Sequence, residues 1–202
     1  MRLDTSSCSE PPWSRLPGAT ALFAGFAVLV FLIPGGSSQW QYDRDAIAAG
    51  EGWRVLTGHL THWNAEHLAW DLLVFVVAGS LLERFVGRHG FLAVLGGSAL
   101  IVSAAVWIAR PDLLTYRGLS GVDCALVVAV ACVAFRRAWE NGNRRLTVAL
   151  GVVLGLCVLK VAYELETGGA VFVDATTAGF VAVPIAHWVG GLAGTAGAVL
   201  RL

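Results

Sequence analysis

Two polar residues, a serine and a histidine, lie inside long apolar stretches of the sequence. Ser120 stands between Gly118 and Gly121 in a Gly-Leu-Ser-Gly segment, and His187 begins the pattern His-x-x-Gly-x-x-x-Gly. A polar side chain in hydrocarbon is costly, so such residues are candidates for function. A hydroxyl and an imidazole can form a nucleophile–base pair, in which the imidazole takes the hydroxyl proton and later returns it to the leaving amine. The two residues therefore predict serine-based nucleophilic catalysis.

Glycines shape the expected surroundings of both residues. Ser120 opens an apolar segment, and the unpaired backbone N–H groups at a helix start favour negative charge. These groups could stabilise an oxyanion, while Gly118 and Gly121 would let a substrate backbone approach. Gly190 and Gly194 lie on or beside the face of the histidine, where small residues allow close helix packing. The alternatives are a plain packing motif and a serine that only bonds a carbonyl one turn earlier.

The composition is that of a membrane protein. Of 202 residues, 56% are hydrophobic and 14% are charged, which does not describe a soluble globular domain. The net charge is zero, which argues against a nucleic-acid partner. The cysteines form no C-x-x-C pair, so we expect small buried side chains rather than a disulfide framework or a metal site.

Six stretches are long enough, or nearly so, to cross a bilayer, which needs roughly 20 apolar residues per helix. They lie near residues 18–33, 68–86, 91–109, 119–136, 146–163 and 176–200. The expected fold is an all-α membrane protein. A six-transmembrane-helix bundle would occupy residues 18–202, preceded by a cytoplasmic N-terminal tail at 1–17.

Arginines are distributed unevenly between the predicted loops. With the N-terminus inside, most of them fall on the cytoplasmic side, and only Arg44, Arg54, Arg110 and Arg117 fall on the other. This bias predicts that both termini are cytoplasmic. The sequence holds one lysine and is rich in Ala, Gly and Val, which is typical of a GC-rich bacterial genome. We therefore expect a multi-pass protein of the bacterial inner membrane, with its active site open to the periplasmic side.

Counting from cytoplasmic arginines places the two candidate residues at similar depth. Ser120 lies sixteen residues from Arg136, and His187 lies fourteen residues from Arg201. A helical rise of 1.5 Å then puts them about 24 Å and about 21 Å above the cytoplasmic boundary. In a hydrocarbon core about 30 Å thick, both lie below the outer surface. The two side chains are therefore expected to meet.

Together, these motifs resemble those of the rhomboid intramembrane serine proteases. The matching pieces are Trp53-Arg54, the histidine-rich start of the second span that ends in Leu82-Glu83, Gly118-Leu119-Ser120-Gly121, and Ala186-His187-x-x-Gly190-x-x-x-Gly194. The resemblance implies a six-transmembrane-helix rhomboid-like bundle and an intramembrane serine endopeptidase that needs no metal or organic cofactor. Its partners would be the lipid bilayer and the transmembrane segments of its substrates.

Two further segments, at residues 68–73 and 116–121, are similar to the rhombosortase branch of that family. The resemblance implies processing of secreted bacterial proteins whose C-terminus carries a Gly-Gly motif, a membrane helix and a basic tail. The substrate partners would then be these C-terminal transmembrane segments.

The resemblance also implies roles around the serine. Ser120 matches the nucleophile and His187 the general base, while His67 matches a histidine that helps to form the oxyanion hole. Asp71 stands where the family usually has an asparagine donor, and it shares a helix face with His67 because they are four residues apart. Asp71 could accept a hydrogen bond from His67 and orient it, or could itself donate when protonated. Cys124 replaces an aromatic ring that often packs against the catalytic histidine.

Two other classes of protein compete with this hypothesis. One is a non-catalytic rhomboid-like protein that binds membrane helices. The other is a zinc-dependent membrane hydrolase, with ligands among His59, His62 and His67 and with Glu66 and Asp71 nearby. The H-E-x-x-H spacing is absent, and the first two histidines fall in an irregular loop, where solvated or interfacial side chains are expected.

Three more polar residues lie in or near the predicted spans. Lys160 and Glu164 are four residues apart, which favours an interfacial pair with a snorkelling lysine. The alternative is recognition of substrate at a gate between the second and fifth spans, where rhomboids are thought to admit a substrate helix. Asp123 follows Ser120 by one turn, and we expect it to contact a partner inside the bundle or a water molecule.

Overall fold

The computed structural model describes residues 17–169 and 183–199. The predicted cytoplasmic tail, except for its last residue, lies outside the described residues. So do the predicted start of the sixth span at 176–182 and the final Arg201.

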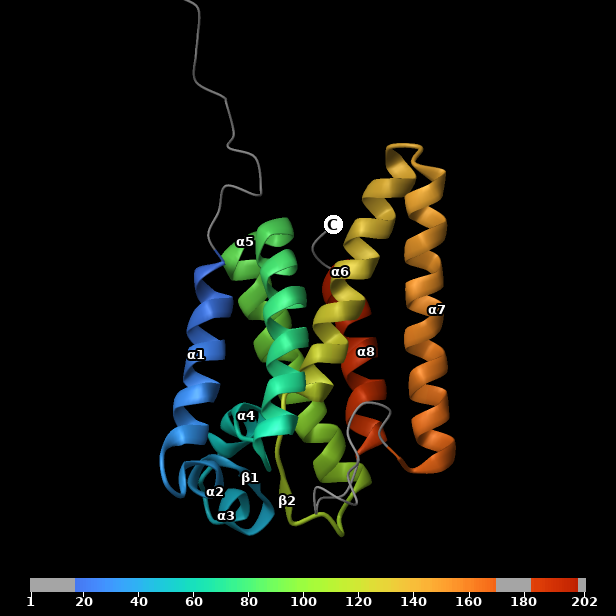
Figure 1. The fold of residues 1–202 in the computed structure, drawn as a ribbon. Helices are drawn as coiled ribbons and strands as arrows, with labels where there is room; N and C mark the ends of the chain where they lie inside the picture. Colours follow the sequence, from blue (N-terminus) through green and yellow to red (C-terminus); the bar gives the residue numbers. More distant parts are fainter. Residues whose placement is uncertain (1–16, 170–182, 200–202) are drawn as a thin grey trace, which may run out of the picture.

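The described part of the chain is mostly helical, as predicted (Figure 1). The long helices are α1 (Gly18–Leu32), α5 (Ala65–Ala109), α6 (Ser120–Glu140), α7 (Arg144–Thr167) and α8 (Pro184–Val199). The short elements are α2 (Gly36–Trp40), β1 (Tyr42–Asp43), α3 (Arg44–Ala48), α4 (Arg54–Thr57), the 3₁₀ helix η2 (Gly58–Leu60) and β2 (Thr115–Tyr116). Helices thus lie within each of the six predicted ranges.

Helix α5 contains both the second and the third predicted spans. Gly87 interrupts its helical backbone with φ 76° and ψ 170°, a conformation that glycine adopts without a steric cost. The chain reverses there, so that the two arms of α5, residues 65–86 and 88–109, lie side by side (Figure 1). Phe75 and Phe91 join the arms through an edge-to-face contact with ring centroids 6.3 Å apart. A glycine turn replaces the longer connection expected between these spans.

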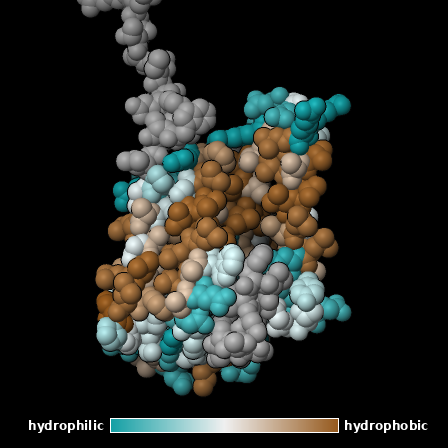
Figure 2. Space-filling model, in the orientation of Figure 1, coloured by the Kyte–Doolittle hydropathy of each residue, from teal (hydrophilic) through white to brown (hydrophobic). Residues whose placement is uncertain are grey.

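Among the described residues, two helices, α5 and α7, are long and apolar enough to cross a membrane by length and composition. Helix α1 is apolar but has only 15 residues. That all six helical segments cross the bilayer remains a prediction. Exposed apolar side chains nevertheless cover the middle of the face in Figure 2, with polar side chains near its ends. On α7, exposed apolar residues include Val148, Val152, Leu156 and Leu159.

The first helix is held by a buried glutamate from another segment. Glu83, in the first arm of α5, accepts hydrogen bonds from the backbone N–H groups of Ala19 (3.0 Å) and Thr20 (2.8 Å). The Thr20 hydroxyl also donates to it at 2.8 Å. These N–H groups lie at the positive end of α1 and have no partner within the helix. Glu83, although distant in the sequence, therefore caps α1.

Helix α6 lies at the centre of the bundle, where it packs against α5, α7 and α8. Its contact with α8 is very close: a Cβ atom built on Gly190 would collide with the carbonyl oxygen of Gly121. A Cβ on Gly194 would collide with the carbonyl oxygen of Ala125. The two glycines therefore let the backbones of α6 and α8 touch, which brings the starts of both helices together.

The short elements form a cap over one end of the bundle (Figure 1). Strands β1 and β2 pair in antiparallel register, with Tyr42 opposite Tyr116. Arg117 donates to the side-chain oxygen of Gln41 at 2.8 Å and lies over the ring of Trp63, 4.2 Å from its centroid. Arg54 donates to the Gln41 carbonyl at 3.0 Å. These contacts tie the cap to the segment that leads into α6.

Candidate active site

The serine and the histidine meet as their depths predicted. Ser120 is the first residue of α6, and His187 lies in the first turn of α8. Oγ of Ser120 and Nε2 of His187 are 3.0 Å apart, which is within hydrogen-bond reach of a nucleophile and its base. Because glycine packing joins the starts of the two helices, the tertiary fold holds this pair in place.

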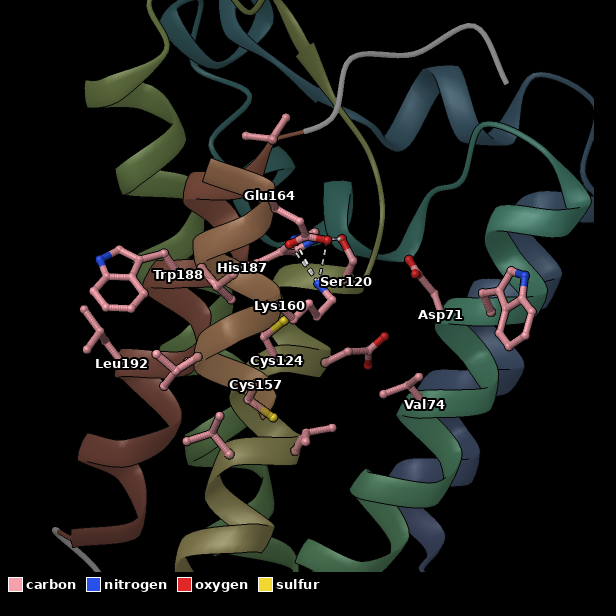
Figure 3. A pocket seen from close by; sticks show the side chains of 18 of the residues that line it. Asp71, Val74, Ser120, Cys124, Cys157, Lys160, Glu164, His187, Trp188 and Leu192 are labelled. Atoms are coloured by element: carbon pink, nitrogen blue, oxygen red, sulfur yellow. Dashed lines mark hydrogen bonds and ion pairs between the residues drawn. The ribbon is translucent and has the colours of Figure 1, made fainter. Parts of the chain in front are cut away.

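A third polar side chain, Glu164 of α7, contacts the other ring nitrogen of His187 (Figure 3). Oε2 of Glu164 lies 2.7 Å from Nδ1 of His187. Lys160 donates to both carboxylate oxygens at 2.8 Å and lies 3.4 Å from Nδ1. The predicted Lys160–Glu164 pair therefore forms, and it is turned towards His187 with Glu164 only 1% exposed.

The contact between Glu164 and His187 was not predicted from the sequence, although residue counting gives an indication that Lys160 and Glu164 lie near the site. Lys160 lies sixteen residues after Arg144, the same count that separates Ser120 from Arg136. The depth count used for Ser120 would therefore have put Lys160 at about 24 Å as well. A charged pair at the depth of the candidate serine is a stronger indication of function than a pair at the interface.

Asp71 holds the backbone immediately before Ser120. Its Oδ2 accepts a hydrogen bond from the N–H of Leu119 at 2.7 Å. The same oxygen lies 3.3 Å from Nε2 of His67 and 3.2 Å from Nε2 of His62. The predicted contact between Asp71 and His67 is thus present, and His62 is a partner that was not predicted. Asp71 joins the start of α5 to the start of α6.

Gly118 occupies a position where a larger residue does not fit. Its φ of 117° lies in the left-handed region that favours glycine. A Cβ atom built there would lie 2.8 Å from Nε2 of His67 and 3.1 Å from Oδ2 of Asp71. Gly118 therefore allows the turn before Ser120 to pack directly on His67 and Asp71.

The two loop histidines are buried rather than solvated, which corrects the prediction for both. His62 is fully enclosed against Asp71. Nε2 of His59 donates to the carbonyl of Ala99 at 3.0 Å and lies 3.0 Å from the hydroxyl of Ser103. Burial lowers the pKa of His59 to about 4, and it also lowers the pKa of His62. Both side chains link the cap to the bundle.

The alternative hypothesis of a zinc site has no set of ligands in residues 17–169 and 183–199. Within these ranges, no three His, Cys, Asp or Glu side chains are placed to hold a metal ion. His59 is directed to the second arm of α5, whereas His62 and His67 share one oxygen of Asp71. The three histidines therefore do not converge on one point.

A cavity of about 780 Å³ opens in front of the serine–histidine pair (Figure 3). The first arm of α5 forms one wall and α7 the other, while α6 and α8 close the back. Most of its lining is apolar, including Val74 of α5 and Cys157 of α7. Cys124 also lines it, at the position where an aromatic ring was expected from the family. The cavity is suited to an apolar segment that reaches Ser120.

Asp123, one turn after Ser120 on α6, also lines the cavity. It is 4% exposed, and neither carboxylate oxygen has a hydrogen-bond partner among the described residues. The partner expected for it inside the bundle is therefore not found in this part of the chain.

Comparison with known protein families agrees with the geometry. The model of the rhomboid domain matches residues 49–202. The chain belongs to the rhomboid family. All the predicted site residues of this rhomboid, from His67 to Gly194, lie within the matched range.

Two relatives come from Bacillus subtilis (strain 168). The rhomboid protease GluP is 30% identical over 105 residues, which are 47% of this chain and 21% of GluP. YdcA, whose name assigns it provisionally to the rhomboid proteases, is 32% identical over 91 residues, 45% of this chain and 46% of YdcA. The matches thus cover less than half of each relative's length.

Proposed function

We propose that this rhomboid is an intramembrane serine endopeptidase in which Ser120 is the nucleophile and His187 the general base. The observation that carries the proposal is the 3.0 Å separation between Oγ of Ser120 and Nε2 of His187. The cavity beside this pair and membership of a family that includes named proteases support it. A non-catalytic protein would have no need for this pair.

The proposed reaction passes through an acyl-enzyme. Oγ of Ser120 attacks the peptide carbonyl carbon while His187 takes the hydroxyl proton, which gives a tetrahedral oxyanion. The carbon–nitrogen bond then breaks, and His187 returns the proton to the leaving amine. A water molecule, deprotonated by the same imidazole, releases the second product and restores the Ser120 hydroxyl.

The start of α6 is suited to stabilise the oxyanion. The N–H group of Ser120 belongs to the first turn of this helix, where backbone donors have no partner within the helix and the helix dipole is positive. His67 lies beside Gly118, close to the same turn, and would be a second donor. Asp71 accepts from Leu119 and contacts His67, so its proposed role is to orient these groups. Gly121 leaves room for the helix contact behind them.

The cavity supports entry of the substrate from the membrane. Its two walls, the first arm of α5 and α7, are the second and fifth predicted spans. A substrate helix would enter between them, unwind near the periplasmic surface and present a peptide bond to Ser120. The proposed location is the bacterial inner membrane, with both termini in the cytoplasm. Recognition of substrate by Lys160 is not part of the proposal, since this lysine already binds Glu164.

The proposed substrates are secreted proteins with a C-terminal Gly-Gly motif, membrane helix and basic tail. This part rests on the similarity of residues 68–73 and 116–121 to the rhombosortase branch. The basic tail would lie on the cytoplasmic side, and the Gly-Gly motif would lie near the periplasmic end of the helix, at the level of Ser120.

The test is co-expression with a tagged secreted protein that carries such a C-terminus. Wild type and Ser120→Ala are compared, and the size and terminal mass of the product are measured. Cleavage only by the wild type would support the serine mechanism and the substrate class, and the terminal mass would tell whether water or another nucleophile released the product. Equal cleavage by both would refute Ser120 as the nucleophile. Cleavage by neither would refute this substrate class.

A further inference from the structure

We infer that Glu164 is a positioning residue for His187, so that the site is a Ser–His–Glu relay assembled from α6, α8 and α7. This inference rests on the proposed function of Ser120 and His187. Nε2 of His187 lies 3.0 Å from Oγ of Ser120. Nδ1 lies 2.7 Å from Oε2 of Glu164 and 3.4 Å from Nζ of Lys160, so the carboxylate is its closer partner. The three side chains thus form one continuous chain of hydrogen bonds.

The carboxylate fixes the tautomer of the imidazole. A neutral histidine carries its proton on one nitrogen, and an ionised carboxylate can only accept hydrogen bonds. Nδ1 must therefore carry the proton and donate to Glu164, which leaves the lone pair of Nε2 facing the Ser120 hydroxyl. This is the tautomer that a general base requires. When Nε2 takes the serine proton, the imidazolium lies beside a negative charge, which stabilises it.

Lys160 makes it possible for Glu164 to stay ionised although its side chain is buried. A buried carboxylate with no partner is costly, whereas one paired with a cation and fully hydrogen-bonded is tolerated. The Lys160 ammonium donates to both Oε1 and Oε2 of Glu164 at 2.8 Å. It cannot accept a hydrogen bond, so it leaves the Nδ1 proton of His187 to Glu164. The pair therefore keeps Glu164 in the acceptor state that the relay needs.

The relay depends on how α7 is placed. Three side chains of α7, Thr147, Val161 and Glu164, are buried, and most of the helix surface is exposed. Val161 and Glu164 lie one turn apart near the C-terminal end of α7, and Glu164 joins this end to His187 of α8. Displacement of α7 would separate Glu164 from His187 and leave the base without its partner.

The test uses the full-length protein in detergent and a fluorescent fluorophosphonate, which labels an activated serine covalently. The maximum labelling rate and the probe concentration for half-maximal rate are measured separately. We expect Glu164→Gln to lower the maximum rate by about 100-fold or more, because the amide oxygen turns to Lys160 and its NH₂ then favours the wrong tautomer of His187. The half-maximal concentration should not change, and Glu164→Asp should restore part of the rate.

Glu166→Gln is the matched control, since Glu166 is exposed on the same helix, and it should label at the wild-type rate. In a His187→Ala background, Glu164→Gln should have no further effect, because the two residues act as a unit. Wild-type labelling by Glu164→Gln would overturn the relay alone. A rate loss that Glu164→Asp does not reduce, together with a lower melting temperature for both variants, would also overturn it in favour of a structural role. Equal labelling of wild type and Ser120→Ala would overturn the relay and the proposed function together.

Discussion

At the scale of the residue, Asp71 is the main departure from the family pattern, which usually has an asparagine at this position. Its Oδ2 accepts a hydrogen bond from Leu119 and lies close to the ring nitrogens of His62 and His67. An oxygen that accepts from three donors is more useful as an ionised acceptor than as a donor to the oxyanion. The contacts therefore favour the orienting role over the direct-donor role.

The substitution Asp71→Asn tests this choice. An asparagine keeps one oxygen for Leu119 but loses the negative charge beside the two histidines, so we expect the rate of fluorophosphonate labelling to fall by about 10-fold or more. Asp45→Asn, at an exposed position in α3, is the control and should label normally. An Asp71→Asn rate equal to or above that of the wild type would instead assign direct donation.

At the scale of the element, the contact between α6 and α8 sets the distance between nucleophile and base. Gly190 touches the carbonyl of Gly121, one residue after the serine. The neighbouring Gly191 faces a looser region, where an added Cβ would lie 3.8 Å from Cγ2 of Val128. Two adjacent glycines of one helix thus have opposite tolerance for a methyl group.

Gly190→Ala should therefore separate the helices, lower the melting temperature and nearly abolish labelling of Ser120. Forcing a methyl group into a closely packed contact costs about 1–3 kcal/mol. Gly191→Ala should leave both quantities close to those of the wild type, because its contact is an ordinary van der Waals distance. Equal effects of the two substitutions would show that the helix contact does not control the site.

The cap over the bundle is an element whose stability should depend on pH. Burial lowers the pKa of His59 to about 4, whereas an unfolded histidine has a pKa of about 6.5. The unfolded chain therefore binds more protons between these values, and stability falls as the pH decreases from about 6.5 to about 4. Well above pH 6.5, His59 is neutral in both the folded and the unfolded state, so it adds no pH dependence to the stability.

Relative to neutral pH, the free energy of unfolding should fall by about 3 kcal/mol at pH 4 because of His59 alone. Thermal unfolding of the wild type and of His59→Gln across this pH range measures it, because glutamine can donate a hydrogen bond but does not titrate. The difference in melting temperature between the two proteins should decrease, or change sign, at acidic pH. A difference independent of pH would show that His59 does not supply this proton linkage.

At the scale of the whole molecule, apolar side chains cover the middle of the face shown in Figure 2, and polar side chains collect near its ends. The cap lies at one end, and the turn between α6 and α7, with Arg136, Arg137, Arg144 and Arg145 nearby, lies at the other (Figure 1). The site is near the cap and far from this basic turn. The positive-inside rule therefore predicts that the cap and the site face the periplasm.

Reporter fusions test this orientation. Green fluorescent protein fused after residue 202 should fluoresce, because the C-terminus is predicted to be cytoplasmic. Alkaline phosphatase inserted near Asp112, an exposed residue between α5 and β2, should be active in the periplasm. A reversed pair of signals would invert the proposed topology and put the site on the cytoplasmic side.

The sequence by itself determined the helical segments and singled out Ser120 and His187 as candidate partners, and residue counting predicted that the two lie at similar depth. These properties are local. The length of an apolar stretch predicts a membrane helix, and the number of residues along that helix predicts how deep a given residue lies. The spacing of His67 and Asp71 also predicted their contact, because residues four apart share a helix face. The rhomboid family followed from the same motifs.

Only the tertiary structure decided which partners those residues have. His62 reaches Asp71 from an irregular loop, and Glu164 reaches His187 from a different helix. Residue counting could have put Lys160 and Glu164 at the depth of Ser120, but no periodicity within one helix encodes the rotation of another helix or the path of a loop. Spacing therefore could not predict which side chains Glu164 and His62 contact. Packing fixes both: glycines bring α6 and α8 together, and α7 then places a carboxylate against the histidine.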